Sequence, residues 1–222
     1  MGTDNLFHLK KARKAKSHQR EKARRAPYKR ILIVCEGKKT EPNYFKEFRK
    51  AHGLNPRNVV IADKKDGLDP LNLVKYAIEE YKNDKDFDDV YCVFDRDKHE
   101  TYHAALNKIR DYPMKRGVTL HPITSIPCFE IWLLLHFTYT TKPFCVASND
   151  SNCALLISDL KQYIPSYEKG AEKIYIADER LDFAIDNAKK LDKFHQTSGT
   201  DNPSTKVHEL VDDLRILNKR GS

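Results

Sequence analysis

The hydrophobic residues of the chain fall into short continuous runs separated by amphipathic segments. The run at 31–35 is wholly apolar, which is typical of a strand buried on both faces of a sheet. The segment after it has the composition of a helix that Gly53 ends. This alternation recurs along the first 140 residues. It predicts strands at 31–35, 58–63, 89–95 and 118–125, and helices at 40–52, 69–84, 98–112 and 128–137.

Strands that alternate with helices over short connections predict an α/β fold, with a mainly parallel sheet flanked by helices. After Thr141 the pattern becomes helical, at 151–164, 176–195 and 203–218. The chain therefore divides into three predicted parts. These are a basic arm at 1–29, an α/β core at 30–141, and a helical extension at 142–222 that packs on the core.

Helix-start residues explain several polar positions without any chemistry. Thr40 is predicted to be an N-cap, with Glu41 and Pro42 in the first turn. Ser204 or Thr205 is predicted to cap the last helix. We therefore assign these residues to helix initiation rather than to a functional site.

Positive charge is concentrated at the N-terminus. The formal net charge is +8 over 222 residues, yet residues 1–30 hold 11 Lys and Arg against two acids, and the remainder has a net charge of −1. Such a segment favours contact with a phosphate backbone, through residues that include Arg13, Lys14, Arg24 and Arg25. A solubilising tail is the alternative, and both interpretations stay open.

Cysteine usage and hydropathy bear on the compartment. The five cysteines form no C-x-x-C pair and no zinc-type spacing with histidine, so we expect packing roles for them. No apolar run approaches the roughly 20 residues of a membrane span, and the N-terminus lacks the apolar stretch of a secretory signal. We expect a cytoplasmic protein without membrane contact.

Acidic residues follow two of the predicted strands. Glu36 comes directly after the first strand, and Asp95 and Asp97 lie at the end of the third. Ligands of an open parallel sheet bind at the carboxyl ends of its strands, so the three carboxylates would converge if these strands are neighbours. Carboxylates in a cluster suit Mg²⁺ or Mn²⁺. Phosphate contacts are predicted for the cations beside them, Lys38, Lys39 and Arg96.

These blocks resemble a known family. A strand ending in Glu-Gly, followed by one ending in Asp-x-Asp, is similar to the TOPRIM domain of topoisomerases, primases and OLD-type nucleases. The blocks ILIVCEGKKTEPNYF, VYCVFDRDKH, SIPCFEIWLLLHF and NPSTKVHELV further resemble the RloB-like family, over about residues 28–218. That family is associated with bacterial anti-phage and abortive-infection loci, in which an AAA-type ATPase is often encoded alongside.

The resemblance implies roles for individual residues. Glu36 would be a general base or a metal ligand, and Asp95 and Asp97 would be Mg²⁺ ligands. Glu130 would be a further metal ligand or catalytic acid, although favourable interaction with the helix macrodipole explains it equally well. Trp132 and His136 fit a core helix better than a binding site.

A second charged stretch has two interpretations. Tyr167, Lys169 and Lys173 could contact a phosphate backbone, or they could form a solvated charge cluster. Sequence alone does not separate the two.

The leading functional hypothesis is an Mg²⁺-dependent TOPRIM-type nuclease that acts as a phage-defence effector under control of a partner ATPase. The substrate is DNA or RNA, with structured RNA such as tRNA as one variant. The rival is a non-catalytic adaptor that binds metal, nucleotide or nucleic acid for the ATPase. Self-association stays open.

Overall fold

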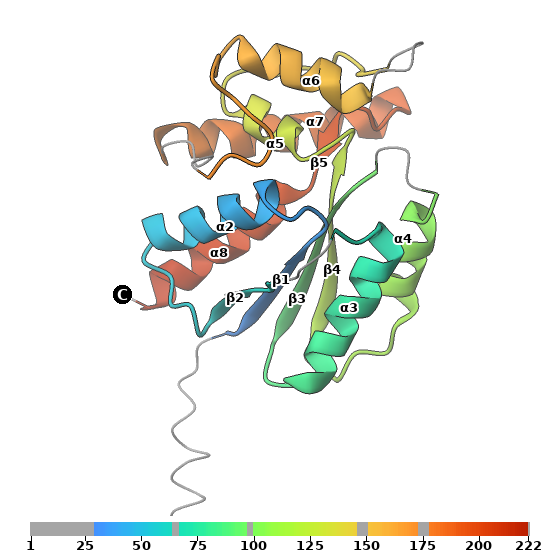
Figure 1. The fold of residues 1–222 in the computed structure, drawn as a ribbon, viewed down its shortest axis with the longest axis vertical. Helices are drawn as coiled ribbons and strands as arrows, with labels where there is room; N and C mark the ends of the chain where they lie inside the picture. Colours follow the sequence, from blue (N-terminus) through green and yellow to red (C-terminus); the bar gives the residue numbers. More distant parts are fainter. Residues whose placement is uncertain (1–28, 64–66, 97–99, 146–150, 173–177, 222) are drawn as a thin grey trace, which may run out of the picture.

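The computed structural model describes residues 29–63, 67–96, 100–145, 151–172 and 178–221 (Figure 1). Its centre is a five-stranded sheet in the order β2-β1-β3-β4-β5. The strands are β1 (Ile31–Cys35), β2 (Val59–Ile61), β3 (Asp89–Asp95), β4 (Thr119–Ile126) and β5 (Ser204–Thr205). Strands β2, β1, β3 and β4 pair in parallel, and β5 pairs antiparallel with β4. The predicted α/β fold with a mainly parallel sheet is confirmed.

The helices overlap the ranges predicted as helical, although several are shorter. They are α2 (Thr40–Ala51), α3 (Pro70–Asn83), α4 (Tyr102–Asp111), α5 (Glu130–Leu135), α6 (Asn152–Lys161), α7 (Leu181–Ser198) and α8 (Val207–Gly221). A 3₁₀ turn, η1 (Asp178–Arg180), precedes α7. Within the described part of the chain, no helix is both long and apolar enough to cross a membrane.

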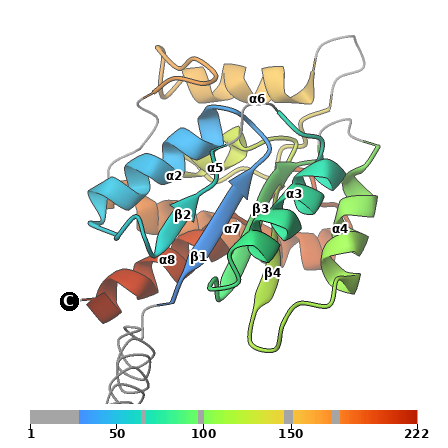
Figure 2. The same cartoon turned by 60° about the horizontal axis from the view of Figure 1, so that its bottom comes forward.

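Helices cover both faces of the sheet, as Figure 2 shows. Ile31, Ile33 and Cys35 point into an apolar cluster built with α2, α5, α7 and α8. Leu32 and Val34 point the other way, into a cluster built with α3 and α4. The continuous apolar run of β1 is therefore buried on both faces, as predicted from its composition.

Helix α5 lies in the first cluster, and every one of its side chains is buried. This confirms the predicted core helix. His136 directly follows it, is fully buried, and shares a hydrogen bond of 2.8 Å between its Nδ1 atom and the Trp132 carbonyl. Burial lowers the pKa of His136 to about 4. His136 is thus a neutral core histidine at pH 7, as the pattern favoured.

Two predictions about helix starts need correction. Thr40 is the first residue of α2 rather than its N-cap, which is Lys39, and the Thr40 hydroxyl instead accepts from the Gly170 N–H at 3.0 Å. The predicted helix at 203–218 begins only at Val207. The preceding Thr205 lies in β5, where its hydroxyl does accept from the Val207 N–H at 3.2 Å. A two-residue strand is too short to produce a recognisable alternation.

Candidate active site

The ends of β1 and β3 lie side by side at the carboxyl edge of the sheet. The parallel register pairs Cys35 with Val93, which brings Glu36 next to Asp95. The Glu36 carboxylate accepts a hydrogen bond of 2.9 Å from the Asp95 backbone N–H, and the Glu36 N–H donates to the Val93 carbonyl at 2.8 Å. The strand adjacency that a carboxylate cluster requires is therefore present.

Glu41 brings a third carboxylate to this edge. It lies in the first turn of α2 and is buried, with 6% of its surface exposed. The Gly37 N–H donates to Glu41 Oε1 at 3.2 Å. A Cβ atom on Gly37 would lie 2.2 Å from Glu41 Oε2, so the carboxylate fits here because residue 37 is glycine. Glu41 thus lies in the first turn of α2, as predicted, and its side chain in addition lines the cavity at this edge, which was not predicted.

Glu130 supplies the fourth carboxylate from the start of α5. Only 1% of its surface is exposed, and the Tyr167 hydroxyl donates to its Oε1 atom at 2.9 Å. Burial and the negative charge of Glu130 raise the pKa of Tyr167, so this hydroxyl keeps its proton and stays a donor. Interaction with a helix macrodipole does not require such burial, so the macrodipole does not account for Glu130 by itself.

The four carboxylates disturb one another. Burial raises the pKa of Asp95 well above its usual range, and the charges of Glu41, Glu130 and Glu36 raise it further. Lys169 opposes this shift. The pKa of Glu41 is also raised, chiefly by burial and then by Glu130 and Glu36, against hydrogen bonds that lower it. Mutual repulsion of this kind is relieved by protons or by a bound cation.

A cavity of about 620 Å³ opens over the carboxylates of Glu36, Glu41 and Asp95. This volume lies in the range of small-molecule and nucleotide sites. Basic side chains line it together with the acids. Its wall consists of Glu36, Gly37, Lys38, Lys39, Thr40, Glu41, Gly67, Leu68, Asp69, Asp95, Cys128, Lys169 and Gly170.

The predicted phosphate-binding cations separate into two groups. Lys38 and Lys39 line the cavity and are exposed. Arg96 does not line it, because its guanidinium pairs with Asp201. The other predicted cations lie outside the described residues: Arg13, Lys14, Arg24, Arg25 and Lys173. The predicted metal ligand Asp97 also lies outside them.

The donor atoms test how well a divalent cation would fit. Among the described residues, the groups whose donors all lie within 4.8 Å of one another are Cys128–Glu130–Cys153 and Asp192–His208–Glu209. Neither group contains Glu36 or Asp95. Carboxylate oxygens are the correct ligands for Mg²⁺ or Mn²⁺. For Glu36 and Asp95 to hold a single ion, however, their side chains would have to rotate or Asp97 would have to supply a further ligand.

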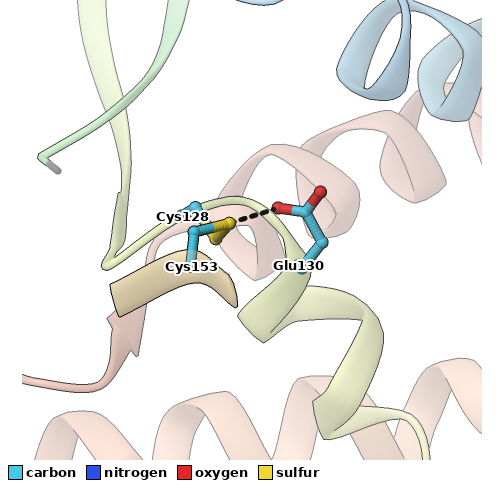
Figure 3. Close-up of side chains that lie close together, drawn as sticks. All are labelled: Cys128, Glu130 and Cys153. Atoms are coloured by element: carbon cyan, nitrogen blue, oxygen red, sulfur yellow. Dashed lines mark hydrogen bonds between the residues drawn. A yellow bond between two sulfur atoms is a disulfide. The ribbon is translucent and has the colours of Figure 1, made fainter. Parts of the chain in front are cut away.

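The cysteines depart from the expected packing roles. Cys35 and Cys92 are buried and form no disulfide, as expected, and Cys145 is exposed. Cys128 and Cys153 instead form a disulfide beside Glu130 (Figure 3). The two cysteines are 25 residues apart and show no motif spacing, which is why the sequence does not predict the pair.

Sequence reasoning missed Glu41 and underrated Tyr167 and Lys169. Both lie beyond α6, where Lys169 lines the cavity and Tyr167 donates to Glu130, and no local periodicity predicts these contacts. Glu41 carried one usable indication, since it lies only five residues after Glu36 and opens the helix that starts at the cavity. The solvated-cluster interpretation fails for Tyr167, which is buried.

Comparison with known proteins returns one match. Neither the curated proteins nor the solved structures contain a match to this chain. The family model described as RloB-like protein matches residues 31–214, which covers most of the chain and all four carboxylates. The resemblance to the RloB-like family is confirmed, and the chain belongs to the RloB-like protein family.

Proposed function

We propose that this protein is an Mg²⁺-dependent nuclease that hydrolyses phosphodiester bonds of DNA or RNA in the cavity. One observation carries the proposal: the buried or half-buried carboxylates of Glu36, Glu41 and Asp95 line one cavity together with exposed lysines. A phosphate group can bridge a divalent cation and ammonium groups, and this mixture of charges suits it. A TOPRIM-like arrangement, with its Glu at one strand end and Asp at the next, is part of the proposal.

Each residue has a role in this proposal. Glu36, Asp95 and Asp97 would hold Mg²⁺ or Mn²⁺, and Glu36 would also accept a proton. When bound, the cation polarises a phosphoryl oxygen and favours ionisation of the attacking water. Lys38 and Lys39, which line the cavity, orient the phosphate.

Two further carboxylates, one predicted from the sequence (Glu130) and one not (Glu41), have supporting roles. Glu41 and Glu130 add negative charge around Asp95. That charge makes binding of a cation in the cavity more favourable. Both residues are buried, so neither is placed to bind nucleic acid directly.

The biological setting follows from the family association and is likewise proposed. The nuclease would act as an effector of bacterial anti-phage defence in the cytoplasm, restrained or triggered by an AAA-type ATPase. The N-terminal basic arm would add affinity for the nucleic-acid backbone. Structured RNA such as tRNA is the variant substrate.

Cleavage of end-labelled DNA and structured RNA in Mg²⁺ or Mn²⁺ tests the function. Glu36→Gln should lower the cleavage rate by at least about a hundredfold, because it removes a carboxylate at the metal. Glu79→Gln, on an exposed position of α3, is the matched control and should cleave like wild type.

Two outcomes would reject the nuclease. Full activity of Glu36→Gln would show that the proposed centre is wrong. Calorimetric binding of Mn²⁺ and nucleic acid without any product, in the presence of the partner ATPase, would instead support the adaptor.

A further inference from the structure

Residues 151–172, here called the strap, reach the cavity wall through Lys169 and Gly170, which line it. The strap contains α6 and the segment after it. At its far end, the Gly170 N–H donates to the Thr40 hydroxyl at 3.0 Å, and the Ala171 carbonyl accepts from the Asn43 side chain at 3.2 Å. These contacts tie the strap to the first turn of α2, beside Glu41.

The strap also supplies two side chains to the carboxylate site. Tyr167 donates to Glu130, and Lys169 lines the cavity and opposes the rise in the pKa of Asp95. Correct placement of the strap is therefore a condition for the charge balance of the cavity.

Among the described residues, one disulfide bond links the start of the strap to the rest of the protein. Cys153, in the first turn of α6, is bonded to Cys128 in the turn after β4. Cys128 lines the cavity, whereas Cys35, Cys92 and Cys145 form no disulfide. The disulfide thus joins the strap to the wall of the site itself.

Charged groups surround the sulfur of Cys153, as Figure 3 shows for Glu130. Lys169 Nζ lies 3.7 Å from Cys153 Sγ, and Glu130 Oε2 lies 3.5 Å from the same atom. A disulfide sulfur carries no proton, so the contact with Glu130 becomes a hydrogen bond only when Cys153 is a thiol. An ammonium group beside a sulfur stabilises a thiolate leaving group. Glu130 can therefore accept from the Cys153 thiol, and Lys169 can stabilise the Cys153 thiolate when the disulfide is reduced.

We propose that Cys128 and Cys153 form a thiol–disulfide exchange site for dithiol reductants, and that the state of this pair controls whether the strap stays docked on the carboxylate cavity. Cys128, the cysteine of the pair that lines the cavity, is the point of attack, and Lys169 stands beside the sulfur that leaves. In a reducing compartment such as the expected cytoplasm, disulfides are more often redox-sensing than structural.

The exchange is balanced. A thiolate of the dithiol attacks Cys128 Sγ, the bond between the two Sγ atoms breaks, and Cys153 leaves as a thiolate beside Lys169. The second thiol of the reductant then displaces Cys128. The two electrons come from the dithiol, which becomes a disulfide, and its two protons end on the cysteines. The Cys153 thiol then donates to Glu130.

The proposal does not rest on nuclease activity, and its test uses no cleavage assay. The full-length protein is equilibrated in dithiothreitol buffers that range from oxidising to reducing. Differential alkylation and mass spectrometry measure the state of each cysteine, and hydrogen exchange measures the strap. Reduction should convert Cys128 and Cys153 together, and should speed amide exchange in 151–172 by about tenfold, with α3 unchanged.

Two variants separate this effect from general damage. Cys153→Ser should show the fast exchange of the strap in every buffer. Cys145→Ser removes a free, exposed cysteine and should respond like wild type. Two results would overturn the proposal: Cys128 and Cys153 alkylated as free thiols even in the oxidising buffers, or strap exchange that is the same in both redox states.

Discussion

The two ends of β3 hold aspartates in opposite electrostatic surroundings. Asp89, at the start, forms an ion pair with Lys29 and a hydrogen bond of 2.8 Å with His121. Asp95, at the end, is surrounded by carboxylates, with Lys169 as a single opposing charge among the groups that shift its pKa. One strand therefore carries a neutralised aspartate and a crowded one about six residues apart.

The pKa values of the two aspartates move in opposite directions. Burial raises the pKa of Asp89, but hydrogen bonds from His121 and Lys29 outweigh it, so that the net shift is downward. Burial and three neighbouring acids raise the pKa of Asp95. Ionic groups at the first end stabilise the fold, whereas those at the second cost stability, as is common at functional sites.

Removal of one charge at each end should affect stability differently. Asp89→Asn leaves Lys29 and His121 without their anionic partner, and we expect the free energy of unfolding to fall by about 2 kcal/mol. Asp95→Asn removes a source of repulsion, and we expect the same quantity to stay constant or rise. Urea unfolding of both variants in EDTA measures the difference. Equal destabilisation would break the comparison.

Addition of a Cβ atom next to Glu41, near the Asp95 end of β3, tests how tightly the carboxylates are packed. Gly37→Ala would place a Cβ atom 2.2 Å from Glu41 Oε2, so that carboxylate must move. We expect cleavage to fall by about tenfold, a typical cost of disturbing the surroundings of a metal site. Gly67→Ala is the matched control, because its Cβ atom would meet the Glu36 carbonyl only at 3.9 Å. Equal rates for the two variants would contradict the assigned position of Glu41.

The pH dependence of stability should show the two ends separately. The ordinary aspartate pKa is 3.8. Because the folded pKa of Asp89 is lower, its contribution is present above pH 3.8 and is lost as the pH falls through the folded value. Because the folded pKa of Asp95 is higher, the folded state binds the proton more tightly, and stability falls as the pH rises from 3.8 through the folded value.

Unfolding of the metal-free protein between pH 3 and pH 8 measures both contributions. Asp89→Asn should flatten the loss of stability on the acid side. Asp95→Asn should flatten the loss of stability toward neutral pH. The charged groups that act on the Asp95 side chain are Glu36, Glu41, Glu130 and Lys169. Unchanged slopes in both variants would exclude these assignments.

The sequence predicts most of the fold because β1, β3 and their helices have strong local patterns. The continuous apolar runs in the sequence predict that Glu36 and Asp95 lie at strand ends. It does not place Glu41, whose first-turn position is equally consistent with helix initiation, or β5, which has only two residues. Tyr167, Lys169 and the disulfide depend on contacts between distant segments, and such contacts leave no periodic pattern.

The most direct test of the account is metal-dependent cleavage by two variants that carry the same substitution on the same strand, Asp95→Asn and Asp89→Asn. Labelled nucleic acid is incubated with each folded variant in Mg²⁺ and in EDTA, at a temperature where both are native. The account predicts that Asp95→Asn loses at least about a hundredfold in rate while Asp89→Asn keeps the wild-type rate. Wild-type cleavage by Asp95→Asn, or equal loss in both variants, would contradict it.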